Sequence, residues 1–382
     1  MSGLTFRTAG ESHGPTLLGI VEGMPSGLEL DVPRIDRELA RRQRGYGRGG
    51  RMKIERDRVE VVSGLRQGLT LGSPVGFLVE NKDAVIDKLP VPGDPRPGHA
   101  DLAGCQKHGH HDPRAVLERA SARETAARVA AGGIARQLLE HLGVEVFAHT
   151  VALGGVEVAP GGLEAAGDRY GALREESDFL SLDPEADGRM RKAVDAAKAA
   201  GDTLGGVFEV VARGLPPGIG GYASWDERLT GRLAGALLSI PAMKGVEFGM
   251  GFEVARRPGS EVHDPIERAP EGAPWGRFQR RSNRSGGLEG GMTTGEPLVA
   301  RVAMKPIPTL RQGLDSVDFA TGEAVHATWQ RSDVTSVPAA SVVGEAMVAL
   351  VLADAVRRQF GGDSLEQVRR AWDAYGADLR GL

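Results

Sequence analysis

The segment AGESHG, residues 9–14, places a glutamate, a serine and a histidine on a short stretch between two glycines. Glycine adopts backbone conformations that other residues avoid, so this spacing predicts a tight turn that restricts the direction of its side chains. His13 is the residue best suited to chemistry on that turn, because imidazole exchanges a proton near neutral pH. Ser12 adds a neighbouring hydroxyl. The turn is thus a candidate site of proton transfer.

A second loop, residues 94–114, contains a further turn-bound histidine. His99 follows a Pro-Gly pair and precedes Ala-Asp, which predicts a constrained imidazole and a second candidate for proton transfer. Cys105 and His108 have the C-x-x-H spacing of zinc ligands, but a zinc site needs three or four converging ligands. The histidines after residue 107 fit surface or capping positions better, so a metal site remains the weaker alternative.

Closely spaced arginines and glycines fill residues 40–53 (ARRQRGYGRGGRMK). Gly45, Gly47 and Gly50 match G-x-G-x-x-G, but they follow a predicted helix and lead toward a strand, which is the reverse of the dinucleotide-binding context. An RNA-binding Arg-Gly tract is the other alternative, and the net charge of −4 and the aromatic content of 5% argue against it. The remaining interpretation is a set of guanidiniums that face a small anion, with Arg48 as the best candidate.

A predicted helix after residue 120 offers a further anion site. Ser121 and Glu124 have the spacing of a capping box, and Arg119 lies two residues before Ser121. A helix N-terminus beside a guanidinium suits phosphate, although the same residues also fit an ordinary capped helix. Together with Lys305 and Asp333 in later Pro-containing loops, these groups predict an enzyme acting on a small phosphorylated, carboxylated molecule.

Composition limits the class of protein. The chain has 382 residues, of which 41% are apolar and 26% charged, typical of a globular protein. The single cysteine, Cys105, excludes an internal disulfide and favours a reducing compartment. The opening residues have no apolar signal core, and we expect the run AMVALVLADAV to be too short to span a bilayer. We therefore expect a cytoplasmic protein.

The elements that position these residues alternate between strands and helices without a linker-like composition. Alternating or continuous apolar runs between turn residues predict the strands, and apolar faces of helical period with capping residues predict the helices. We expect strands within 16–24, 58–64, 72–81, 144–158, 204–216 and 244–254, and helices within 31–45, 121–143, 226–240 and 340–360. Residues 160–202 are expected to form a helical excursion on the surface. We therefore favour one α/β domain of the α+β type over residues 1–382, with helices packed against antiparallel sheets.

Eight separated motifs resemble those of the chorismate synthase family, in the same order. They run from residue 9 to about residue 340: AGESHG, RRQRGYGRGGRM, RPGHAD, ERASARETAARVAAG, GDTLGG, GGLEGGMTTGEP, MKPIPT and QRSDVTSVPAA. The resemblance implies a fold, a β-α-β sandwich with helices between antiparallel sheets. It also implies a reaction, the anti 1,4-elimination of phosphate from 5-enolpyruvylshikimate 3-phosphate to give chorismate. That reaction belongs to the shikimate pathway of aromatic amino acid biosynthesis.

The resemblance also implies a cofactor and catalytic roles. The family needs reduced FMN although the reaction has no net redox change. His13 resembles the histidine near the substrate phosphate, with Ser12 as a neighbouring contributor. His99 resembles the histidine that protonates reduced flavin. Asp333 resembles the aspartate implicated in removal of the C6 hydrogen.

Binding residues follow from the matched motifs in the same way. Arg42 and Arg48 resemble arginines linked to substrate and NADP. Pro241 stands where glutamine is common in the family. The positions that match FMN-binding residues are Arg119, Ala120, Ser121, Pro241, Ala242, Gly290, Lys305, Pro306, Ile307, Pro308, Thr309 and Arg331.

The resemblance implies partners as well. The family assembles as a homotetramer, and its members that reduce their own flavin tend to be longer, so at 382 residues we expect an external flavin reductase. The alternative activity is that of a flavin-dependent oxidoreductase acting on a small phosphorylated acid.

Overall fold

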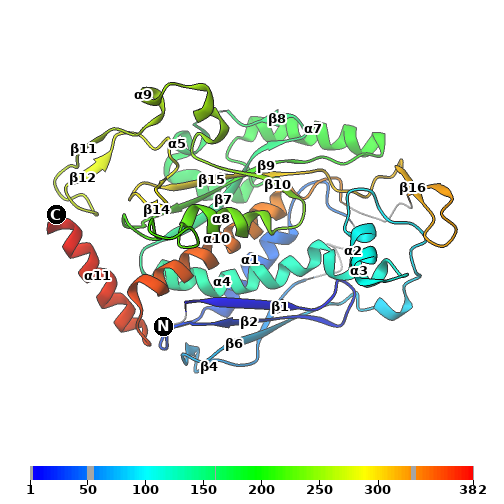
Figure 1. Cartoon of the computed structure of the whole chain (residues 1–382), viewed down its shortest axis with the longest axis horizontal. Helices are drawn as coiled ribbons and strands as arrows, with labels where there is room; N and C mark the ends of the chain where they lie inside the picture. The colour runs from blue at the N-terminus through cyan, green and yellow to red at the C-terminus, as the bar shows by residue number, and fades with distance from the viewer. Residues whose placement is uncertain (1–2, 50–55, 160, 328–332, 382) are drawn as a thin grey trace.

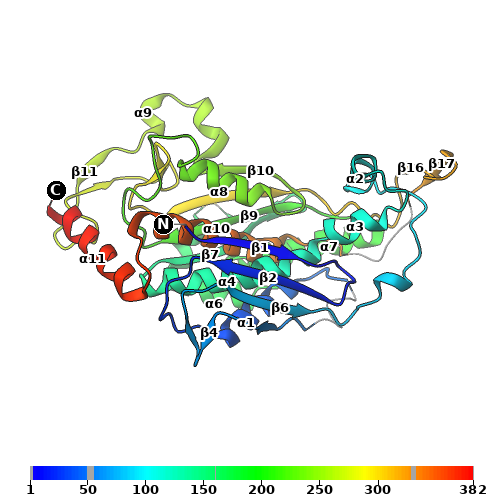
Figure 2. The ribbon, with the colours of Figure 1, turned by 60° about the horizontal axis from the view of Figure 1, so that its bottom comes forward.

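Two antiparallel sheets lie on either side of a layer of helices in the computed structural model (Figures 1 and 2). The structure describes residues 3–49, 56–159, 161–327 and 333–381. The first sheet has the order β1 (Thr5–Ala9), β2 (Thr16–Glu22), β6 (Val75–Glu80) and β3 (Val59–Val61). The second has the order β10 (Met243–Phe248), β15 (Leu298–Met304), β9 (Gly206–Arg213), β7 (Glu145–Leu153) and β8 (Val156–Glu157).

The helix layer consists of α1 (Val32–Gln43), α4 (Thr125–His141), α8 (Leu229–Leu238) and α10 (Val337–Phe360). Helix α4 contacts β2 of the first sheet, and α10 contacts β7 and β9 of the second. The two helices also pack against each other. This arrangement confirms the predicted α+β class, with helices between antiparallel sheets.

Shorter elements surround these layers. The other helices are α2 (Asp101–His108), α3 (Arg114–Ala120), α5 (Gly162–Ala166), α6 (Tyr170–Glu176), α7 (Pro184–Ala200), α9 (Gly259–Val262) and α11 (Leu365–Gly381). The 3₁₀ turns are η2 (Ile86–Lys88), η3 (Ala122–Glu124), η4 (Gly167–Arg169) and η5 (Gly251–Arg256). Two-stranded hairpins are formed by β4 (Leu65–Arg66) with β5 (Leu69–Thr70), β11 (Ile266–Arg268) with β12 (Phe278–Arg280), β13 (Leu288–Glu289) with β14 (Met292–Thr293), and β16 (Asp315–Val317) with β17 (Ala324–His326). Helices α5 to α7 confirm the predicted helical excursion.

Local sequence explains why these elements form. In β2, Leu17 and Val21 are fully buried, whereas Leu18 and Ile20 on the opposite face are exposed, so the helix layer covers only one side of that sheet. Helix α1 begins as predicted, since the Asp31 carboxylate accepts a hydrogen bond from the backbone N–H of a first-turn residue.

The centre of the molecule is α10, which is mainly apolar and buried along most of its length. It is long and apolar enough to cross a membrane by length and composition, which corrects the expectation drawn from the shorter apolar run. Yet 94% of its most apolar window is buried inside the protein, as in a core helix. Close approach is possible because Gly132 of α4 faces Ala346, where an added Cβ would lie 2.3 Å from the Ala346 Cβ.

The predicted capping box at Ser121 is wrong. Helix α4 starts only at Thr125, and the Ser121 hydroxyl instead accepts from the Arg123 N–H at the start of η3. The Glu124 side chain is used elsewhere: its Oε1 accepts a 2.6 Å hydrogen bond from the Thr8 hydroxyl. The tertiary contact with β1 therefore replaces the local cap.

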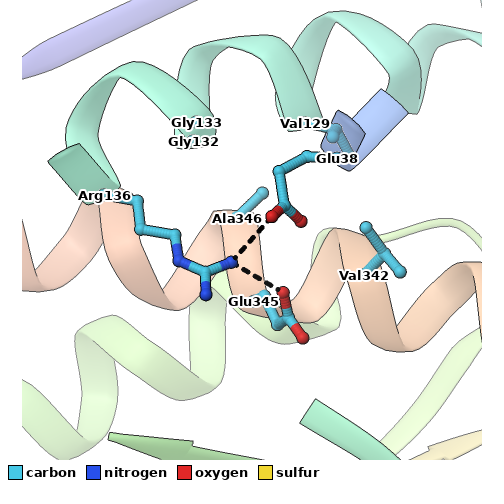
Figure 3. Close-up of a pocket in the computed structure, with 8 residues that line it drawn as sticks. All are labelled: Glu38, Val129, Gly132, Gly133, Arg136, Val342, Glu345 and Ala346. Carbon is cyan, nitrogen blue, oxygen red and sulfur yellow. Dashed lines mark hydrogen bonds and ion pairs between the residues drawn. The ribbon is translucent and has the colours of Figure 1, made fainter. Parts of the chain in front are cut away.

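A buried ionic cluster joins four elements around Glu345 of α10. Its carboxylate accepts from Arg41 of α1 at 2.9 Å through both oxygens, from Arg136 of α4 at 3.1 Å and from Arg174 of α6 at 3.1 Å. It also accepts from the backbone N–H of Ala148 in β7 at 2.7 Å. Figure 3 shows Arg136 bridging Glu345 and Glu38 beside a cavity of about 10 Å³. The cluster fixes α1 directly before the arginine-rich loop.

Candidate active site

The predicted chemical residues lie mostly at one end of the molecule, where the loops of several elements meet. The β1–β2 turn, α2 and α3 are neighbours there in both views (Figures 1 and 2). The segments just before α4 and α10, and the C-terminal end of α1, contribute through the side-chain contacts described below.

His13 sits on the β1–β2 turn against Glu118 of α3. Its Nδ1 lies 2.9 Å and 3.1 Å from the two Glu118 oxygens, and its backbone N–H donates to Glu118 at 2.9 Å. The other ring nitrogen, Nε2, lies 3.8 Å from an Asp83 oxygen. Arg114 donates to Glu118 from the opposite side at 3.0 Å. Burial alone would raise the pKa of Glu118, but its bonds to His13 and Arg114 lower it, so the carboxylate stays charged at neutral pH.

Other side chains fix the backbone of this turn. The Asn81 amide donates to the carbonyls of Glu11 and Gly14 at 3.0 Å and 2.7 Å. Arg119 donates to the carbonyl of Gly10 at 2.8 Å, and also to Thr8. Its guanidinium therefore braces the turn, whereas the sequence predicted a phosphate contact for this group.

Ser12 and Ser121 come together beside the turn. The two hydroxyls lie 3.3 Å apart, and Ser12 is 1% exposed. Ala120, the last residue of α3, lies directly before Ser121. The structure thus brings the first motif of the chain next to the ERASARET motif, as the predicted site requires.

Arg42 is buried between the end of α1 and the start of α4. It donates to the Thr125 hydroxyl and the Ala122 carbonyl, both at 3.0 Å, and lies 3.5 Å from Asp57. Arg123 donates to the two oxygens of the same Asp57 carboxylate at 2.6 Å and 2.7 Å. Burial lowers the pKa of Arg42 to about 10 despite the Asp57 charge. Keeping the guanidinium charged therefore costs free energy, which the negative charge of a bound anion would offset.

Arg48 and Asp333 form the neighbouring pair at the start of α10. Arg48 Nη1 lies 3.1 Å from the Asp333 carboxylate and donates to the Ser336 hydroxyl at 3.1 Å. Asp333 also accepts from the Gly49 N–H at 2.5 Å and from Ser336 at 3.0 Å. The Gly-rich loop therefore folds back onto α10, and both predicted residues meet.

His99 contacts the carboxylate of Asp101. Its Nδ1 lies 2.5 Å from Asp101, and Arg96 donates to the same carboxylate at 2.8 Å. Burial would raise the pKa of Asp101, but the hydrogen bonds and charges of His99 and Arg96 hold it well below its usual range. The arrangement repeats the carboxylate contact of His13 in a different loop.

The MKPIPT segment adjoins this histidine loop. A Cβ built on Gly98 would lie 3.6 Å from the Pro308 side chain and 3.7 Å from the Lys305 Nζ. The Lys305 N–H donates to the carbonyl of Ala242, which has a left-handed backbone with φ of 74°. Lys305, Ala242 and the neighbouring Pro241 are therefore close in space, together with the segment from Pro306 to Thr309.

One predicted position among the described residues, Gly290, is not brought to the group around Lys305 and Ala242. Gly290 lies at the tip of the β13–β14 hairpin, and the adjacent Gly291 accepts a backbone hydrogen bond from Leu229 at the start of α8. Pro241 follows the other end of α8, about 15 Å away along a helix of 10 residues. Arg331 lies outside the described residues.

The sequence did not assign a role to the carboxylates that hold these cations. Glu118 and Asp57 are 2% and 5% exposed, and each contacts residues that lie far away in the chain. Arg123 was missed as well, although it lies inside the ERASARET motif. The sequence offered only the presence of charged residues close to the motif arginines. The actual pairing of carboxylates with cations depends on how the β1–β2 turn and α1 pack against the rest of the fold.

Comparison with known proteins decides the family. The family model described as chorismate synthase matches residues 4–356. The chain belongs to the chorismate synthase family. The resemblance in the motifs and the predicted class of enzyme, a lyase, are thereby confirmed.

Individual relatives match over their whole length. The chorismate synthase of Trichlorobacter lovleyi is 52% identical over 392 residues, covering 99% of this chain and 100% of the relative. That of Desulforudis audaxviator is 54% identical, covering 96% and 95%. A crystal structure of a chorismate synthase superimposes with a TM-score of 0.81 at 41% identity and covers both chains completely. These matches support the lyase and give no support to the alternative oxidoreductase.

Proposed function

We propose that the protein converts 5-enolpyruvylshikimate 3-phosphate into chorismate and inorganic phosphate by an anti 1,4-elimination, in which the C3–O bond to phosphate breaks and a C6 hydrogen is lost. The observation that carries the proposal is the convergence of Arg42, Arg48 and Arg123, which contact Asp57 and Asp333 in the part of the chain that the structure describes. The cluster lies within a chain that matches the family from residue 4 to residue 356. A phosphate dianion with two carboxylates is a ligand that fixed guanidiniums recognise.

In this proposal, His13 delivers a proton or a positive charge to the departing phosphate. Its imidazole is anchored through Nδ1 and is part of a turn fixed by Asn81 and Arg119. A fixed donor needs no reorganisation when charge develops on the leaving group. Ser12 supports the turn through its contact with Ser121.

Asp333 and His99 are proposed to handle the remaining proton movements. Asp333 carries the carboxylate assigned to removal of the C6 hydrogen, and Arg48 with Ser336 sets its orientation. His99 is held on Asp101 and is assigned to hold a proton toward the cofactor. Both residues are buried enough to be shielded from bulk water, which strengthens their electrostatic contacts.

The residues near Lys305 fit a phosphate-bearing cofactor. Burial and the neighbouring Lys244 ammonium both lower the pKa of Lys305. No carboxylate pairs with either ammonium among the residues that the structure describes. Two cations without a counter-charge are a donor set suited to the phosphate of FMN. Lys305 to Thr309, with Pro241 and Ala242, would hold FMN, which in its reduced form lends an electron transiently during the elimination.

The proposal includes the wider expectations of the family. We propose that the chain of residues 1–382 acts as one domain in a homotetramer, that it works in the cytoplasm, and that an external flavin reductase supplies reduced FMN. Arg42 and Arg48 are also the residues proposed to contact NADP. Exposed Leu18 and Ile20 on the outer face of β2 are apolar surface that assembly would bury, which light scattering on the purified protein would test.

The decisive experiment is an anaerobic assay with purified protein, 5-enolpyruvylshikimate 3-phosphate and chemically reduced FMN. We expect equal release of chorismate and phosphate with substoichiometric flavin, and none with oxidised FMN. Consumption of reduced flavin in proportion to substrate would contradict the elimination and indicate an oxidoreductase. NADPH-driven turnover without a separate reductase would contradict the expected external reductant.

A further inference from the structure

The function proposed above gives Glu118 no role, yet its carboxylate accepts several hydrogen bonds from His13 and Arg114. It is 2% exposed and accepts hydrogen bonds from the His13 backbone, the His13 ring and Arg114. The Glu118 carbonyl also accepts from the Ser12 N–H at 2.9 Å. Glu118 therefore contacts both Ser12 and His13.

We propose that Glu118 is the positioning residue for His13: it fixes the imidazole with its proton on Nδ1 and directs Nε2 toward the reacting phosphate. This inference rests on the proposed function, because it needs His13 to act on the substrate. A carboxylate accepts hydrogen bonds but does not donate them when ionised, so the Nδ1 contact requires a proton on Nδ1. Nε2 is then the nitrogen that exchanges a proton with the leaving group.

Several charged groups surround the His13 ring. The charged groups around His13 are Glu118 and Arg114 on α3, Asp83 after β6, Glu11 on the same turn, and Arg119, which is bonded to the turn at Gly10. Glu118 is the only one of these carboxylates within hydrogen-bonding distance of the ring in the described contacts.

Arg114 offers a second way to change the charge around the Glu118–His13 pair. It donates to Glu118 at 3.0 Å and thereby shares the carboxylate's negative charge with His13. Removal of Arg114 leaves Glu118 to act on His13 alone. The two neighbouring substitutions, Glu118→Gln and Arg114→Gln, are therefore expected to shift the proton affinity of His13 in opposite directions.

A second pair in the chain serves as a matched control. His149 of β7 lies 3.2 Å from Glu209 of β9 through Nε2, and it is 3% exposed. This histidine–carboxylate pair belongs to the second sheet and not to the candidate site. Glu209→Gln thus makes the same chemical change at a comparable pair and should leave His13 unaffected.

The test measures carbethoxylation of His13 by diethyl pyrocarbonate, which reacts with neutral imidazole, at a series of pH values by mass spectrometry of the purified full chain. The midpoint should move to lower pH in Glu118→Gln, move to higher pH in Arg114→Gln, and stay unchanged in Glu209→Gln. The high-pH limb of turnover should shift in the same directions, because a protonated His13 is required. Equal midpoints in the wild type and both α3 variants would overturn the proposal.

The readouts separate this inference from the proposed function. An inactive wild type with the expected midpoint shifts would refute the elimination while leaving the Glu118–His13 link intact. Shifted carbethoxylation with an unshifted turnover profile would overturn the positioning role itself. If Glu118→Gln does not fold, the upward shift in Arg114→Gln still decides the question, and a missing shift there counts against the proposal.

Discussion

Both histidines and several arginines of the candidate site contact an acidic residue. Glu118 holds His13, Asp101 holds His99, Asp333 holds Arg48, and Asp57 lies between Arg42 and Arg123. The pairing fixes these side chains before any ligand arrives. A site of this kind stabilises developing charge without first reorganising its own dipoles.

Removal of either histidine side chain tests the proposed proton transfers. His13→Ala and His99→Ala should each lower turnover by roughly two to four orders of magnitude, the usual range for a positioned acid–base group. FMN should still bind in both variants, which flavin fluorescence would show. Turnover close to that of the wild type in either variant would refute the role of that residue.

Lys305 allows a sharper test of cofactor binding. Lys305→Met removes one of the two ammoniums near the proposed phosphate position, and we expect FMN to bind roughly tenfold to a hundredfold more weakly, the value of a charge-assisted hydrogen bond. Riboflavin, which lacks the phosphate, is the control ligand. Equal weakening of riboflavin and FMN would show that Lys305 does not contact the phosphate.

At the scale of elements, α4 and α10 form the close contact at the centre of the sandwich. An added Cβ on Gly132 would lie 2.3 Å from the Ala346 Cβ and 2.5 Å from its Cα, so the helices cannot keep their spacing around a larger residue. Gly344 has a similar role against β9, where a Cβ would lie 2.5 Å from the Phe208 ring. Small residues thus set the distance between the layers.

The substitution Gly132→Val should lower the free energy of unfolding by about 1–3 kcal/mol or more, because overpacking at a backbone contact forces the helices apart. Urea unfolding followed by circular dichroism measures the change. Gly235→Ala on α8 is the control, since nothing lies within 4 Å of its added Cβ. That control should stabilise by up to about 1 kcal/mol through helix propensity. Similar stabilities for the two variants would refute the packing argument.

The sequence predicted most elements, because apolar period and capping residues are local signals. Asp31 and the apolar face of α1 defined that helix correctly, whereas Ser121 did not define the start of α4. The Glu124 side chain does not cap its own helix, because it accepts a hydrogen bond from Thr8 in β1, 116 positions away. The positions of His13 and His99 were predictable from their motifs, but their carboxylate partners depended on such long-range docking.

At the scale of the whole molecule, Glu345 links α1, α4, α6, α10 and β7 through one carboxylate. Burial would raise the pKa of Glu345, but three arginines lower it from its usual 4.5 to about 2. A lowered pKa in the folded state means that this contribution to stability is complete above about pH 4.5. It is lost as the pH falls toward about 2.

Glu345→Gln should therefore lower the free energy of unfolding by about 3–5 kcal/mol at pH 7, the range for a broken buried ion pair. The difference from the wild type should shrink as the pH is lowered from about 5 toward 2.5. Denaturant titrations at several pH values measure this. Glu253→Gln, in an exposed cluster with Arg256 and Arg257, is the control and should leave stability nearly unchanged, because solvent screens exposed ion pairs. A pH-independent difference would contradict the ionic explanation.

The position of α10 has a consequence for biosynthesis. The helix that fills the centre of the molecule is encoded after residue 336, yet it packs against α1 and α4 from the first 141 residues and against β7 and β9 from the middle of the chain. A nascent chain that ends before Phe360 has two sheets with no complete layer between them. We therefore expect the growing polypeptide to expose apolar surface until α10 has been synthesised, and chaperones to occupy it during that interval.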